Sequence, residues 1–177
     1  SGTFLQAWSN GEHIRVWSQY FLGVRPDMLS RRIDVQPRIP SAISSLDQRV
    51  SIADGALECT YRRASGAQEQ YRYCWTGTGE VTLGISIGAF APLEVTVPQG
   101  SMLTLSCTPE HLTARLYAAD GTVLYETEAA VDERIAGLHE EWDRFFGGTD
   151  FAAPNYRENI KALSRYFDPP LDYQSIE

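Results

Sequence analysis

Carboxylates are the most numerous side chains here that could do chemistry, with 23 Asp and Glu residues in the chain. Glycoside hydrolysis uses a pair of them, and inverting enzymes hold the pair roughly 6.5–9.5 Å apart around a water. Glu12 is of interest because it lies in a segment with the pattern of a buried helix. It is either a salt-bridge partner or a residue that lines a site. Five others are expected on the solvated face of one helix: Asp132, Glu133, Glu140, Glu141 and Asp143.

Histidines and cysteines give no pattern for metal or nucleophilic chemistry. The sequence holds no P-loop, no GxGxxG and no HExxH motif. The cysteines are odd in number and lack CxxC spacing, which favours buried thiols on strands over a zinc site or a disulfide framework. We therefore expect no metal and no cofactor. The residues concerned are His13, His111 and His139, each expected at the surface or in a cap, and Cys59, Cys74 and Cys107.

Composition and charge limit the classes of partner. The chain has 177 residues, 43% of them hydrophobic and 21% charged, which is typical of a globular domain with or without a helical appendage. Its formal net charge of -8 disfavours binding to nucleic acid or to an anionic membrane. No apolar run approaches the ~20 residues of a membrane span. The first residues have no basic n-region and no h-region, so no signal peptide is expected within this chain.

The first predicted element is a helix over residues 4–22, which contains the candidate residue Glu12. Gly23 is expected to end it, with Pro26 just beyond. Apolar side chains run nearly all the way round this helix, as in a helix that is covered on more than one side. The pattern indicates a piece of a larger helical assembly. Its apolar residues are Phe4, Leu5, Trp8, Ile14, Val16, Trp17, Tyr20, Phe21 and Leu22.

After residue 48 apolar residues recur at every second position, in place of the helical spacing. Residues 24–48 are expected to be irregular, with a short strand at 33–35. A type I′ turn is expected at Asp120-Gly121, and a helix is expected over 129–146, packed against a sheet. About eight short strands predict an antiparallel β-sandwich. They are 50–53, 57–62, 69–76, 81–87, 93–97, 103–107, 112–117 and 123–127.

Three aromatic residues alternate on one predicted strand: Tyr71, Tyr73 and Trp75. Aromatic rings stack on sugar faces, so an exposed stripe would make a carbohydrate-binding surface. The same stripe on the inner face would be core. The pattern favours the core, and the sequence leaves both interpretations open.

The first forty residues resemble one family. Gln6-Ala7-Trp8-Ser9-Asn10-Gly11-Glu12 resembles the Q-A-W-S-x-A-E stretch of bacterial amylo-α-1,6-glucosidase and glycogen-debranching-type proteins. Residues 20–27 are similar to the family's F-L-G-x-R-P-D, and residues 33–40 to its proline-punctuated segment. The resemblance is specific over residues 3–40. Gly11 stands where the family has alanine, a change that costs about 1 kcal/mol of helix propensity.

The resemblance implies that residues 4–22 are the closing helix of an (α/α)6 barrel. Trp8-Ser9-Asn10-Gly11 is also similar to the W-T-N-G of trehalase-like enzymes, whose general base precedes the tryptophan. Residues 1–7 contain no carboxylate, so both catalytic carboxylates are expected upstream. Trp8, Ser9 and Glu12 are then expected near the substrate of the complete enzyme. Trp8 would stack on a sugar ring or wall the pocket, Ser9 would cap the helix or donate to a sugar hydroxyl, and Glu12 would orient a neighbouring residue.

Four regions follow: residues 1–24 as the terminal barrel helix, 25–48 as linker, 49–128 as β-sandwich, and 129–177 as helix and tail covering the sheet. We expect a non-catalytic C-terminal domain of an inverting glycoside hydrolase that acts on α-glucan branch points, with no catalytic residue of its own. Its partners would be the upstream barrel and the glucan, in the cytoplasm or alternatively the periplasm. The alternative function is a free-standing carbohydrate-binding module, using the aromatic stripe or another exposed set.

Overall fold

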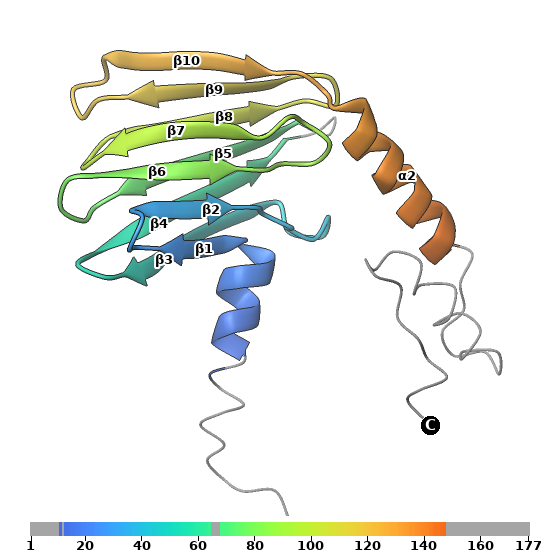
Figure 1. The fold of residues 1–177 in the computed structure, drawn as a ribbon, viewed down its shortest axis with the longest axis horizontal. Coiled ribbons are helices and arrows are strands. Elements are labelled where there is room, and N and C mark those ends of the chain that lie inside the picture. The colour runs from blue at the N-terminus through green and yellow to red at the C-terminus, as the bar shows by residue number, and fades with distance from the viewer. Residues whose placement is uncertain (1–10, 12, 65–67, 148–177) are drawn as a thin grey trace, which may run out of the picture. The chain divides into compact units, whose positions relative to one another are not determined.

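Two packed β-sheets form the body of the protein (Figure 1). The computed structural model describes residues 11, 13–64 and 68–147. The chain divides into two units, Ser1–Glu133 and Arg134–Glu177. The first unit contains both sheets, whose buried apolar side chains form one core cluster. This confirms the predicted mainly β sandwich.

The larger sheet has six strands, all paired antiparallel in the order β10-β9-β8-β5-β4-β3. Buried and more exposed side chains alternate along β8 and β9, as expected for strands with one face on a core. Each strand of this sheet overlaps one predicted from the sequence, but β3 begins at Ser45, inside the segment predicted as linker. Its strands are β3 (Ser45–Ile52), β4 (Gly55–Arg63), β5 (Glu69–Trp75), β8 (Met102–Cys107), β9 (Leu112–Tyr117) and β10 (Val123–Ala129).

The smaller sheet corrects the sequence prediction in two respects. Its order is β1-β2-β6-β7, and β2 pairs with β6 in parallel, so the sandwich is not entirely antiparallel. The segment 25–48, predicted as an irregular linker with a short strand at 33–35, contributes two strands to it. The strand at 33–35 is confirmed as part of β2, where Ile33 and Val35 bury their side chains in the core, and β1 was not predicted. Pro26 is compatible with β1 because β1 is an edge strand. The strands are β1 (Val24–Asp27), β2 (Arg32–Val35), β6 (Glu80–Ile85) and β7 (Leu93–Pro98).

The N-terminal helix ends where the sequence predicts. Its described part is helical and closes with the π-helical turn η1 (Val16–Phe21). Gly23 follows with a φ of +68°, a left-handed conformation that suits glycine. The backbone N–H of Arg38 donates to the Phe21 carbonyl at 2.9 Å, and that of Gln36 donates to the Gly23 carbonyl at 3.0 Å. These bonds tie the end of the helix to the chain that follows β2.

The turn between β9 and β10 lies at Asp120-Gly121, as predicted, but it is not of type I′. Type I′ needs positive φ at both central residues, and of this pair only Gly121 has it, at +86°. The N–H of Gly121 donates to the Ala118 carbonyl at 2.9 Å, and that of Ala118 donates to the Thr122 carbonyl at 2.8 Å. A type I turn followed by a left-handed glycine accounts for this pattern.

Ala53 gives a test of backbone strain in the β3–β4 hairpin. It has a φ of +49° although it carries a Cβ, which costs about 1–2 kcal/mol. Replacing it with glycine also raises the entropy of the unfolded chain, by roughly 0.5–1 kcal/mol. We therefore expect Ala53→Gly to raise the free energy of unfolding by about 0.5 kcal/mol in urea titrations. Ala119→Gly, at an exposed turn position without positive φ, should lower it instead.

The second unit contains the predicted C-terminal helix, α2 (Glu133–Gly147), which begins at the boundary between the units. The helix itself is confirmed, and its packing on a sheet stays a prediction. No helix in the described part of the chain combines the length and apolar character needed to cross a bilayer.

Candidate functional site

Trp8, Ser9 and Glu12, the residues predicted to lie near a substrate, are outside the described residues. Their proximity to a substrate therefore stays a prediction. In the part of the chain that the structure describes, no three His, Cys, Asp or Glu side chains are grouped to hold a metal ion. Cys59 and Cys107 are buried and Cys74 is half-buried, all unpaired thiols on strands, as predicted.

The aromatic stripe of β5 belongs to the core. Tyr71, Tyr73 and Trp75 are all buried in the cluster between the sheets. Their ring faces are therefore closed to a sugar, and the alternative interpretation of this stripe as a carbohydrate platform is wrong. Alternation alone could not decide between the two, because it fixes which residues share a face but not which face meets solvent.

One short motif was missed in the sequence. Residues Gly84 to Gly88 match GxSxG, the pattern of a hydrolase nucleophile elbow. That chemistry needs a strand, a sharp turn and then a helix. Here Ser86 directly follows β6, its N–H donates to the Val35 carbonyl at 3.0 Å, and the chain continues to β7 without a helix. The match therefore lacks the structural context of a nucleophile.

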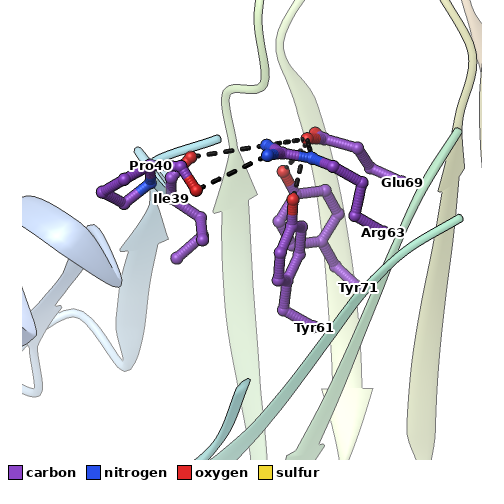
Figure 2. Close-up of polar contacts among 6 residues, drawn as sticks. All are labelled: Ile39, Pro40, Tyr61, Arg63, Glu69 and Tyr71. Atoms are coloured by element: carbon purple, nitrogen blue, oxygen red, sulfur yellow. Dashed lines mark hydrogen bonds and ion pairs between the residues drawn. The ribbon is translucent and has the colours of Figure 1, made fainter. Parts of the chain in front are cut away.

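A half-buried ionic cluster joins β4, β5 and the segment after β2 (Figure 2). The Glu69 carboxylate lies at its centre. Its Oε1 accepts hydrogen bonds from the Tyr61 hydroxyl at 2.9 Å and from Arg63 Nε and Nη2 at 3.0 and 2.6 Å. Its Oε2 accepts one from the Tyr71 hydroxyl at 2.7 Å. Arg63 also donates weakly to the Ile39 and Pro40 carbonyls, both at 3.5 Å.

The electrostatics of this cluster favour a fixed charge on Glu69. Partial burial raises the pKa of Glu69, but hydrogen bonds from Tyr71, Arg63 and Tyr61 outweigh it and hold the pKa below the usual value. Burial, followed by the neighbouring carboxylate, raises the pKa of Tyr61 to about 12. A carboxylate whose two oxygens already accept four hydrogen bonds is a poor general acid or base. The cluster is therefore a structural clamp.

A groove of about 330 Å³ crosses the outer face of the six-stranded sheet. Volumes of this size accept small ligands. Its side chains alternate along their strands with core residues such as Tyr71, Leu103 and Ala114, so they point away from the core. The lining is Gln70 and Arg72 from β5, Met102, Thr104 and Ser106 from β8, and Thr113, Arg115 and Tyr117 from β9.

Strand register sets the order of side chains across this groove. Arg72 pairs with Thr104, which pairs with Arg115, so one hydroxyl lies between two guanidinium-bearing residues. The next row is Gln70, Ser106 and Thr113. Adjacent strands lie about 4.8 Å apart, so each row presents polar groups at short, regular intervals. The groove is thus lined with donors and acceptors for a polyhydroxylated ligand.

The two arginines of the groove differ in their partners. Arg115 is paired with Glu126 on β10, with Nε at 2.8 Å and Nη2 at 2.7 Å from the same carboxylate oxygen. Among the described residues, Arg72 has neither a hydrogen-bond nor an ion-pair partner for its exposed side chain. No carboxylate belongs to the groove lining. The groove therefore offers a free guanidinium on a protein whose net charge is -8.

A second groove, of about 260 Å³, lies on the outer face of the four-stranded sheet. Arg32 spans it, bonding Asp34 through Nε at 2.7 Å and Glu94 through Nη1 at 2.6 Å. Both carboxylates flank Gly84 in the register, and a Cβ there would lie 2.3 Å from an Arg32 nitrogen. Gly84 thus leaves room for the guanidinium, and Arg32, Asp34 and Glu94 neutralise one another within this groove, which Arg25 also lines.

The groove over β5, β8 and β9 was missed in the sequence because its residues are typical of any solvated strand face. The signal that could have found it is the combination of Arg72 and Arg115 with Thr and Ser at alternate positions of neighbouring strands. No protein-family model, characterised protein or solved structure shows a significant match to this chain.

Proposed function

We propose that this chain is the non-catalytic C-terminal β-sandwich domain of a glycoside hydrolase of the amylo-α-1,6-glucosidase type, whose N-terminal helix packs into an upstream helical barrel. The observation that supports this most is the apolar character of both sides of that helix. Trp17 and Leu22 pack on the sandwich core. Ile14, Val16 and Tyr20 are 70%, 39% and 51% exposed, as expected for a helix that a partner covers.

The end of the helix suits such a bridging role. Hydrogen bonds from Arg38 and Gln36 to the Phe21 and Gly23 carbonyls fasten the helix to the sandwich, and Trp17 Nε1 lies 3.4 Å from the side-chain oxygen of Gln48 on β3. A barrel that packs on the exposed side would be held firmly by the sandwich behind it. The domain would thereby stiffen the wall of the active site in the cytoplasmic, or alternatively periplasmic, enzyme.

The test is to introduce a charge on the exposed side of the helix in the complete enzyme. Tyr20→Asp should lower the unfolding temperature of the complete enzyme and reduce its release of glucose from limit dextrin severalfold. The reason is that the aspartate would be buried against the barrel without a partner. In the 177-residue chain alone the same change should leave the unfolding temperature within about 2 °C of the original, as for an exposed position. Equal loss in both proteins would contradict a barrel contact.

Tyr125→Asp is the matched control, because Tyr125 on β10 is 43% exposed and far from the helix in sequence. It should leave glucose release unchanged.

Trp8→Ala tests the predicted substrate wall in the same enzyme, and unchanged turnover would remove Trp8 from the site. Release of glucose by the isolated 177-residue chain would contradict the non-catalytic assignment.

A carbohydrate-binding module is the second candidate, and the groove over β5, β8 and β9 favours it. Tyr117 offers a ring, while Gln70 and the threonine and serine hydroxyls offer hydrogen bonds. If it binds α-glucan, migration in gels cast with glycogen should be retarded, and Tyr117→Ala should abolish the retardation. Tyr125→Ala should not. Unretarded migration of the unmodified chain would contradict α-glucan binding.

A further inference from the structure

We propose that the groove over β5, β8 and β9 binds a saccharide that carries carboxylate groups, with Arg72 as the residue that receives the carboxylate. This inference rests on the second candidate function, a carbohydrate-binding groove, and names the class of its ligand. The inferred ligand is not a neutral α-glucan, because a neutral ligand would leave the free guanidinium of Arg72 in the groove lining without a partner.

The position of Arg72 carries the charge argument. Its register partners are Thr60 on β4 and Thr104 on β8, neither of them charged. The diagonal neighbours on β4 already have partners: Glu58 lies 3.7 Å from Arg49, and Arg62 bonds Asp47 at 2.8 Å. A guanidinium matches the planar, two-oxygen geometry of a carboxylate and binds it with paired hydrogen bonds. Arg72 is thus placed to accept an acidic group from outside.

The rest of the groove lining favours a sugar acid over a simple anion as the ligand. Gln70, Thr104 and Ser106 surround Arg72 with an amide and two hydroxyls, which can both donate to and accept from sugar hydroxyls. Tyr117 and Met102 lie in the neighbouring row and offer an apolar surface for the carbon face of a ring. One charge amid many neutral polar groups suits a ligand with many hydroxyls for each carboxylate.

Competing polymers fit the groove less well. The strands beneath it are hydrogen-bonded on both sides, so they offer no free backbone edge to an extended peptide. Nucleic-acid binding relies on several clustered cations, whereas here Arg115 is paired with Glu126 and the protein is acidic overall.

The experiment is isothermal titration of the 177-residue chain at low salt with two matched probes. Trigalacturonate and maltotriose are both α-1,4-linked trimers, and only the first is charged. We expect trigalacturonate to bind at least tenfold more tightly, and Arg72→Gln to remove that difference because the paired, charge-assisted bonds are lost. Arg38→Gln is the control, since it removes the same charge from an exposed side chain that does not line the groove. It should change the affinity less than twofold.

Each other outcome has a distinct meaning. Equal binding of the two trimers, unaffected by Arg72→Gln, would overturn the acidic class and leave a neutral saccharide groove. No binding of either trimer at millimolar concentration would overturn both this inference and the binding-module function, while the barrel contact is tested separately through Tyr20. Displacement of trigalacturonate by equimolar inorganic sulfate or oligo-dT would show a general anion site and overturn the saccharide assignment.

Discussion

Replacing Gly23 with alanine is expected to lower the free energy of unfolding by more than about 3 kcal/mol. A Cβ at this position would lie 1.9 Å from the backbone oxygen of Gln36 and 2.1 Å from its carbonyl carbon, at a φ of +68°. Backbone atoms cannot swing aside as a side chain can, and the strain of left-handed alanine adds about 1–2 kcal/mol. Urea unfolding followed by circular dichroism would measure the loss.

Gly121→Ala is the matched control for this change. Gly121 has a φ of +86°, but a Cβ there would meet nothing within 4 Å. Its cost should be confined to backbone strain, at about 1 kcal/mol. If the two variants lose equal stability, the close approach between Gly23 and Gln36 is wrong. If Gly23→Ala does not fold in plain buffer, its unfolding temperature is compared with that of Gly121→Ala in the presence of a stabilising osmolyte.

Replacing Glu69 with glutamine is expected to cost about 2–3 kcal/mol at pH 7. The change removes the charge that pairs with Arg63 at 2.6 Å and weakens the hydrogen bonds from Tyr61 and Tyr71. Losing one partner of a half-buried, hydrogen-bonded ion pair leaves the other charge poorly solvated. Urea titrations of both proteins would give the difference.

The pH dependence of that difference identifies its cause. The pKa of Glu69 is lower in the folded protein than its ordinary value of 4.5, so the carboxylate stabilises the fold above that value and stops doing so as the pH falls through the folded pKa. The difference between the original protein and Glu69→Gln should therefore be complete at pH 7 and shrink below pH 4.5. Glu58→Gln, at an exposed position of β4, should lower the free energy of unfolding at pH 7 by less than about 0.5 kcal/mol. A difference that stays constant down to pH 2 would contradict the electrostatic cause.

Strands in which apolar residues recur at every second position are predictable because that periodicity is local. β8 in the six-stranded sheet and β6 in the four-stranded sheet both show it, and on β6 the alternating residues Val81, Leu83 and Ile85 are all buried. The helix end at Gly23 is predictable for a similar reason, since a left-handed residue is needed there and glycine adopts it. In these places each residue's immediate neighbours determine its conformation.

The features that the sequence does not reveal depend on distant pairing. β1 is short and contains Pro26, and its partner β2 is held in parallel by β6, far along the chain, a pairing that the strand predicted at 33–35 does not indicate. The Glu69 clamp collects groups from β4, β5 and the Ile39-Pro40 segment, whose spacing forms no motif. The groove around Arg72 arises where three strands meet, and each strand alone has an ordinary solvent-facing side.

The parallel pairing of β2 with β6 has a consequence for how the protein is made. Among the strands, β1 and β2 leave the ribosome before the others, and β3, β4 and β5 all emerge before β6 can join β2. During that interval the nascent hairpin has no neighbour on its inner edge, and Ile33 and Val35 lack the strand that later covers them. Contacts that join distant parts of a chain form slowly. The smaller sheet therefore cannot be completed until β6 and β7 have emerged. Until then its unpaired edge is open to binding by a chaperone or by another unfinished chain.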